Sequence, residues 1–132
     1  MASRRIKQVI VMRTDLNMRK GKMIAQGSHA SMAFLTKEAQ IVEDSFVVQN
    51  MENTSLVMEW MKDGFTKVCL QIGSEQELIE ICNLALEEGL TVNLITDSGF
   101  TEFNGVPTKT CLAIGPNLNE DIDKITSHLK LL

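Results

Sequence analysis

The sequence predicts an α/β fold in which a four-stranded mixed sheet lies between two layers of helices, a three-layer α/β/α arrangement. Apolar, β-branched segments alternate along the chain with segments whose apolar residues recur at helical spacing. The first strand candidate is apolar on both faces, as strands are in sheets that helices cover on both sides. A length of 132 residues suits one domain, and no repeat or linker divides residues 1–132.

The first two elements are a strand and a helix. Residues 7–12 (KQVIVM) are apolar and β-branched enough for a buried strand, and a polar loop follows over residues 13–19. A helix is predicted over residues 20–37, because the segment contains no proline and its apolar residues surround most of the circumference. That helix should be well buried.

The middle of the chain gives weaker signals. Residues 38–53 have little periodicity and are predicted to be an irregular or lid-like connection, followed by a short helix over residues 55–62. Strand character returns at residues 65–72. Ser74 and Glu77 form a capping box, in which each side chain satisfies the other's free backbone donor at the start of a helix.

The remaining segments continue the alternation. The helix ends where Gly89 can adopt the left-handed conformation of a helix stop. Strands are predicted over residues 90–96 and 108–114. A last helix is predicted to start with a capping pair, Asn117 and Glu120. Its apolar face consists of Leu118, Ile122, Ile125 and Leu129.

The composition is that of an ordinary soluble domain, with 44% hydrophobic and 23% charged residues and no apolar run long enough to span a membrane. The N-terminal residues lack the pattern of a signal peptide, so a cytoplasmic location is expected. Cys69, Cys82 and Cys111 are too widely spaced for a zinc site and are expected to be buried, reduced thiols. His29 and His128 are far apart in the sequence, so neither a metal nor another cofactor is expected.

Charge is distributed unevenly. The formal net charge is −4, yet residues 4–22 carry seven basic side chains and one acid, a local charge of +6 that leaves −10 for the rest. Such a segment could bind a polyanion, or it could be a solvated charged arm; charge alone does not separate the two. The basic residues are Arg4, Arg5, Lys7, Arg13, Arg19, Lys20 and Lys22.

Familiar catalytic motifs such as Gly-x-Ser-x-Gly, His-Glu-x-x-His and Gly-x-Gly-x-x-Gly do not occur in the sequence. Two groups of polar residues stand out instead. Lys20 lies at the start of the helix over residues 20–37, whose N-terminus can attract a phosphate. Lys22, Gln26 and His29 form one polar stripe on that helix, within about 60° at 100° per residue.

The second polar group, Asp97, Ser98 and Thr101, directly follows the strand over residues 90–96. Ligands gather beyond the carboxyl ends of strands in open α/β sheets, so the two groups are expected to meet there. Blander interpretations stay open. Asp97 could be a turn residue that bonds its own backbone, and the lysines could be ordinary surface residues. His29 suits a general base, but a structural histidine is equally compatible with its position.

Ordered motifs run through nearly the whole chain. The early ones are Arg13-Thr14-Asp15-Leu16, Lys20-Gly21-Lys22, Ala25-Gln26 and Ser28-His29-Ala30. The later ones are Gly89-Leu90-Thr91-Val92, Asp97-Ser98-Gly99, Thr101, Ile114-Gly115-Pro116 and His128-Leu129-Lys130-Leu131. As an ordered set they are highly specific, and in them the chain resembles the type 2 peptidyl-tRNA hydrolases. The resemblance fades between about residues 36 and 64.

The resemblance implies a small α/β protein, usually a homodimer, whose partner is tRNA. It would hydrolyse, without a metal or other cofactor, the ester between a peptide or N-blocked amino acid and the 3′ ribose. The implied catalytic residues are Lys22, Gln26, Asp97, Thr101 and Thr110. The implied substrate-binding residues are Arg13, Arg19, Lys20 and His29.

In the implied mechanism Asp97 orients a water, directly or through Thr101, and Lys22 stabilises the oxyanion or the terminal phosphate. Gln26 and Thr110 would position the substrate. Two other functions compete with this one. A non-catalytic module that binds tRNA or protein has no need of a carboxylate such as Asp97 beside its cations. An amidase-like hydrolase of a small molecule has no need of the basic segment.

Overall fold

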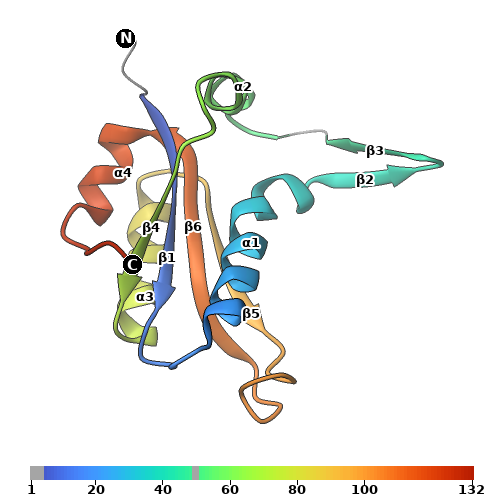
Figure 1. Ribbon diagram of the computed structural model, residues 1–132. Helices are drawn as coiled ribbons and strands as arrows, with labels where there is room; N and C mark the ends of the chain where they lie inside the picture. The colour runs from blue at the N-terminus through green and yellow to red at the C-terminus, as the bar shows by residue number, and fades with distance from the viewer. Residues whose placement is uncertain (1–4, 49–50) are drawn as a thin grey trace.

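The protein is described by a computed structural model over residues 5–48 and 51–132, and its centre is a four-stranded sheet with the strand order β4-β1-β6-β5 (Figure 1). The strands are β1 (Ile6–Arg13), β4 (Lys67–Ile72), β5 (Val92–Asp97) and β6 (Thr108–Leu118). β1 is parallel to β4, while β6 is antiparallel to both β1 and β5. The carboxyl ends of β1, β4 and β5 therefore lie at the same end of the sheet.

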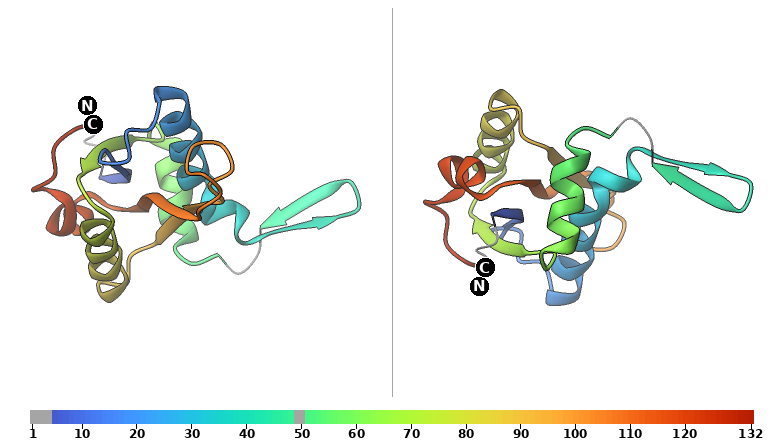
Figure 2. Two further views of the ribbon diagram at one scale, coloured as in Figure 1. Left: turned by 90° about the horizontal axis from the view of Figure 1, so that it is seen from below. Right: turned by 90° about the horizontal axis from the view of Figure 1, so that it is seen from above.

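Helices cover both faces of this sheet, which confirms the predicted three-layer fold. α1 (Lys20–Thr36) and α2 (Thr54–Lys62) lie on one face, and α3 (Glu75–Glu87) and α4 (Asn119–Thr126) lie on the other (Figure 2). Strand β1 contributes side chains to the hydrophobic cores on both faces of the sheet, as its apolar sequence predicts. Val9 and Val11 pack with the residues of α3 and α4, whereas Ile10 and Met12 pack with those of α1.

No helix within residues 5–48 or 51–132 combines the length and apolar character that a membrane crossing needs.

The prediction of an irregular connection is wrong for residues 39–48. They form a hairpin of β2 (Ala39–Val42) and β3 (Ser45–Val48), which projects away from the rest of the molecule (Figure 1). Ile41 and Phe46, which pair across it, are 86% and 75% exposed. Because neither face of the hairpin is buried, its sequence lacks the alternation by which a half-buried strand is recognised. Residues 49–50 of the predicted connection lie outside the described ranges.

The start of the last helix was also placed wrongly. β6 continues past Gly115 and Pro116 to Leu118, and α4 begins at Asn119. Asn117 is therefore a strand residue and caps no helix. Its Oδ1 accepts a hydrogen bond from the Thr91 N–H at 3.0 Å, which ties β6 to the segment before β5. Leu129 lies beyond the end of α4.

Two smaller expectations are partly confirmed. Ser74 caps α3 by accepting a hydrogen bond from the Glu77 N–H at 3.1 Å, but the Glu77 carboxylate accepts from the Gly73 N–H at 3.4 Å rather than from Ser74. Cys82 and Cys111 are buried thiols, whereas Cys69 is exposed. Cys69 lies in β4, an outer strand of the sheet, so an apolar sequence neighbourhood did not imply burial.

Candidate active site

The candidate site lies at the carboxyl end of β5, where three elements meet. Asp97 is the last residue of β5, and Thr101 belongs to the loop between β5 and β6. Lys22 and Gln26 lie one turn apart on α1, and Thr110 lies near the start of β6. All five predicted catalytic residues are thus brought to one place from segments more than seventy residues apart.

The centre of the site is an ion pair between Lys22 and Asp97. The Lys22 Nζ lies 2.9 Å from Asp97 Oδ1, and the two side chains are only 12% and 13% exposed. Nζ also donates to the Thr101 hydroxyl at 2.5 Å. The hydrogen bond from Lys22 holds the pKa of the Asp97 carboxyl below its ordinary value, against the effect of burial. Asp97 is therefore a carboxylate at neutral pH.

Asp97 is held from two other sides as well. The Gln26 amide donates to the same Oδ1 at 3.2 Å, and the Gly99 N–H donates to Oδ2 at 2.8 Å. Both bonds favour the ionised carboxylate and lower its pKa further. The bond to Gly99 is the turn contact of the blander interpretation, so Asp97 both shapes its loop and pairs with Lys22.

Gln26 is fixed by the strand beneath it. Its Oε1 accepts a hydrogen bond from the Thr110 hydroxyl at 2.6 Å, which directs its amide nitrogen toward Asp97. Its backbone carbonyl accepts a weaker bond from the Cys111 thiol at 3.4 Å. Gln26 and Thr110 are 3% and 0% exposed. Thr110 therefore contacts Gln26 from below and does not itself face the open side.

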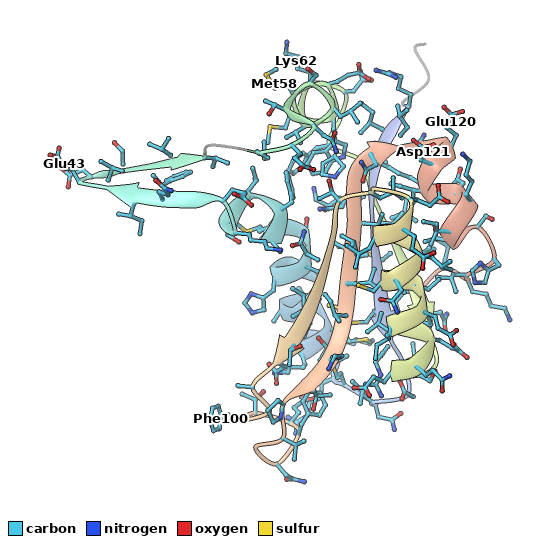
Figure 3. All side chains as sticks on the ribbon, turned by 180° about the vertical axis from the view of Figure 1, so that it is seen from behind. Glu43, Met58, Lys62, Phe100, Glu120 and Asp121 are labelled. Atoms are coloured by element: carbon cyan, nitrogen blue, oxygen red, sulfur yellow. The ribbon has the colours of Figure 1, made fainter. Side chains whose placement is uncertain are left out.

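The loop that carries Thr101 depends on a glycine. Gly99 has φ +88°, and a Cβ there would collide with the backbone of Val106. Its carbonyl accepts hydrogen bonds from the N–H groups of Phe103 and Gly105, which closes the loop. The Phe103 ring centroid lies 5.7 Å from the Lys22 Nζ and forms one wall of the site. Phe100, by contrast, points away from the body and is 85% exposed (Figure 3).

The four predicted substrate-binding residues are placed less uniformly. Arg19 and Lys20 are exposed at the start of α1, which no side chain caps, and Arg19 lies 3.7 Å from the Glu102 carboxylate. His29 is exposed and lines a hollow of about 410 Å³ that Gln26 and Asp97 also line. Of these three residues, His29 shares a hollow with Asp97, whereas Arg19 and Lys20 lie at the start of the helix that carries Lys22.

Arg13 differs from them, because its guanidinium is nearly buried and fully engaged. It makes two bonds to Asp15, at 3.0 and 2.7 Å, and one to the Lys109 carbonyl at 2.9 Å. Its pKa is raised above the ordinary value by the hydrogen bonds to Asp15. The contacts join the loop after β1 to the start of β6, next to Thr110, so the structure places Arg13 behind the site.

The basic segment of residues 4–22 does not form one continuous surface. Arg5 and Lys7 lie at the start of β1, at the far end of the sheet from the site, and pair with Glu59 and Asp123. Arg4 lies outside the described residues. Strand β1 thus separates these charges from the basic residues at the start of α1.

Sequence reasoning missed the structural neighbours of the site. Phe103, Asp15 and Cys111 all contact predicted site residues, but none has a spacing or residue type that marks it. Of the three, only Asp15 belongs to a sequence motif, Arg13-Thr14-Asp15-Leu16, which could have pointed to it. Across residues 5–48 and 51–132, no group of three or more His, Cys, Asp or Glu side chains is arranged as a metal site would require.

Comparisons with known proteins agree with the motifs. The family model for "Peptidyl-tRNA hydrolase PTH2" matches residues 6–132. A protein of Methanocaldococcus jannaschii named peptidyl-tRNA hydrolase is 44% identical over 96% of this chain and its own full length. One of Methanopyrus kandleri with the same name is 41% identical over 96% of this chain and 97% of its own. A probable peptidyl-tRNA hydrolase 2 of Dictyostelium discoideum is 38% identical over 95% of this chain and 54% of its own length.

Proposed function

The chain belongs to the peptidyl-tRNA hydrolase PTH2 family, and on that premise we propose that it hydrolyses the ester between a peptide or N-blocked amino acid and the 3′ ribose of tRNA. The observation that carries the proposal is the buried pair of Lys22 and Asp97, to which Gln26 also donates. A carboxylate that lines a hollow beyond a strand end and is paired with a little-exposed cation suits the hydrolysis of an ester.

The reaction requires a water to attack the ester carbonyl. The new bond joins the water oxygen to the carbonyl carbon, the bond to the ribose 3′ oxygen breaks, and one water proton ends on that oxygen. Asp97 has a lowered pKa, so it is a weak base and a good acceptor. Its role in the proposal is to orient the water, with Thr101 beside it.

Lys22 supplies the positive charge. As the carbonyl oxygen becomes negative in the transition state, the ammonium group can stabilise it, and the low exposure of the pair strengthens that interaction. Gln26 and Thr110 have a positioning role. Thr110 orients Gln26, and Gln26 holds the Asp97 carboxylate toward Lys22.

The tRNA would bind at the start of α1. Arg19 and Lys20 are exposed there, next to helix N–H groups that attract phosphate. His29 borders the hollow on the other side of Asp97 and would contact the esterified residue. Arg13, which is engaged with Asp15, supports this surface from behind in the proposal instead of touching the substrate.

The decisive experiment compares N-acetylated with free aminoacyl-tRNA, each labelled on the amino acid, with and without a chelator. We expect release from the N-acetylated substrate only, at a rate that the chelator leaves unchanged. Equal turnover of both substrates would contradict the proposal, because translation depends on free aminoacyl-tRNA surviving. Binding of tRNA without release of either amino acid would support the non-catalytic module instead.

We further propose that the protein is a cytoplasmic homodimer, as a single domain over residues 1–132. An apolar groove of about 620 Å³ runs between α1 and β4, and Ile24 and Met32 at its rim are 70% and 56% exposed. Burial of such a surface against a second copy would be favourable. Ile24→Arg should convert the dimer to a monomer when the mass is measured by light scattering.

A further inference from the structure

The two outer strands of the sheet differ in what their open sides meet. The outer side of β4 is occupied by residues 130–132: the Gln71 N–H donates to the Lys130 carbonyl and the Leu132 N–H donates to the Cys69 carbonyl, at 2.9 and 3.0 Å. The outer side of β5 pairs with no strand among residues 5–48 and 51–132. It is therefore the side at which another extended chain could add.

The backbone of β5 is oriented for such an addition. The Thr91 carbonyl accepts from the Gly115 N–H, so Thr91 and, by alternation, Asn93 direct their backbone groups toward β6. The backbone N–H and C=O groups of Val92 and Leu94 then point outward. These are the groups that pair with a peptide when it joins a sheet.

A trough accompanies this side of the strand. The hollow at Asp97 shares Ala33, Thr36 and Leu94 with a second hollow of about 490 Å³. The second shares Val92 and Asn93 with a third of about 260 Å³. We call this continuous depression the edge trough; α1 flanks it on one side and, through Leu86, α3 flanks it on the other. It leads from Asp97 back along the whole of β5.

We propose that the edge trough binds the peptide part of the substrate as an added strand beside β5. This inference rests on the proposed function, since it takes the ester to lie at Asp97 and Lys22. The ester is at the carboxyl end of the peptide, and β5 also runs toward Asp97, so the peptide lies parallel to β5. The six residues of β5 match about four to six peptide residues.

Recognition through backbone groups suits this kind of substrate. Nascent peptides share a backbone but no side-chain sequence, and hydrogen bonds to Val92 and Leu94 would be independent of peptide sequence. The walls combine apolar side chains such as Ala33 and Leu86 with polar ones such as Thr36 and Lys37, so they can accept varied peptide side chains. A free aminoacyl group would fill none of the trough, so occupancy of the trough also favours peptidyl over aminoacyl esters.

The test compares two substrates with the same tRNA and the same last amino acid: an N-acetyl-aminoacyl-tRNA and an N-acetyl-pentapeptidyl-tRNA. For the unmodified protein we expect a KM about tenfold lower for the longer substrate, which corresponds to one or two net hydrogen bonds. Lys37→Trp and Leu86→Arg, which fill the second and third hollows but do not line the one at Asp97, should remove that preference and leave kcat/KM for the short substrate within about twofold. Ser55→Arg, an exposed position of α2 outside the trough, is the control.

Each outcome decides the inference. Equal KM values for the two substrates in the unmodified protein, or equal losses on both substrates in the trough variants, overturn it. A thermal transition shows that each variant is folded, and Lys37 and Leu86 are exposed enough to accept the larger side chains. Binding of the free N-acetylated pentapeptide is measured separately by amide hydrogen exchange. Protection of the Val92 and Leu94 amides supports the trough even if neither ester is hydrolysed, and no protection overturns it.

Discussion

Within residues 5–48 and 51–132, a lysine–aspartate pair lies at each end of the sheet. Lys22 and Asp97 are 2.9 Å apart, and Lys7 and Asp123 are 2.7 Å apart. Both pairs join segments distant in sequence. The difference lies in their surroundings, because Asp97 is 13% exposed whereas Asp123 is 51% exposed.

The two lysine–aspartate distances are similar, but the two carboxylates have different hydrogen-bond partners. Asp97 also accepts hydrogen bonds from Gln26 and Gly99. In the part of the chain that the structure describes, the Asp123 carboxylate accepts from Lys7 alone. A short distance is therefore common to a surface ion pair and a candidate site. What separates them is the fixed orientation of the carboxylate and the open hollow beside it.

The largest difference between the pairs should come from Asp97→Asn. This change keeps the shape of the side chain but removes the charge, so turnover of N-acetyl-aminoacyl-tRNA should fall by about 10²-fold or more. Affinity for tRNA should be unchanged. Asp123→Asn is the matched control, and its rate should stay within about twofold. Near-normal turnover of Asp97→Asn would leave Asp97 only a turn residue.

Removing the cations should give the next largest effect. Lys22→Ala should lower kcat by about tenfold or more with some loss of affinity, whereas Lys7→Ala should change neither. Because Lys22 and Asp97 act on one transition state, the double variant should be little slower than the slower single variant. Additive losses in single-turnover rates would mean that the two residues act separately.

The salt dependence of tRNA binding should distinguish the basic residues at the two ends of the sheet. Replacing Arg19 and Lys20 by glutamine should flatten the slope of log Kd against log salt by about one unit for each lost phosphate contact. The same replacement of Arg5 and Lys7, which already have carboxylate partners, should leave the slope unchanged. Equal flattening by both pairs of changes would restore a single basic surface along residues 4–22.

The smallest expected effect concerns pH. The pKa of Asp97 lies below its ordinary value, so the carboxylate is ionised throughout pH 5 to 8 and kcat/KM should show no acid limb from it in that range. The loss should appear only as pH falls through the lowered pKa. In Gln26→Leu, which removes a donor to Asp97, that limb should move toward higher pH. A limb near pH 6 in the unmodified protein would point to another group.

The sequence patterns were sufficient for the layers of the fold and for bringing Lys22 and Gln26 together with Asp97 and Thr101. Thr110 was implied by the family resemblance alone. Strand β1 is apolar on both faces, which required helices on both sides of the sheet. The polar stripe on α1 placed Lys22 and Gln26 together, and the position of Asp97 after a strand brought it to the same end. These inferences depend on short-range periodicity, which tertiary packing preserved.

Other features depend on contacts that periodicity does not report. The hairpin of β2 and β3 is stabilised by its own pairing and buries neither face, so no pattern marked it. Arg13 was grouped with the exposed cations, because nothing in its segment shows that Asp15 and the Lys109 carbonyl enclose it. The split of the basic segment follows from the length of β1, which carries Lys7 and Arg13 to opposite ends of the sheet.

The pairing of residues 130–132 with β4 affects how two copies of the protein could associate. β4 and β5 point in the same direction at opposite margins of the sheet, so a bare β4 could accept the β5 of another copy, and that copy could accept a third. Such head-to-tail pairing would repeat from copy to copy, into a ring or a fibre. Residues 130–132 pair with β4 and so occupy the groups that this contact would need. In the proposal, β5 can therefore bind a peptide at its open side while β4 is closed to the β5 of another copy.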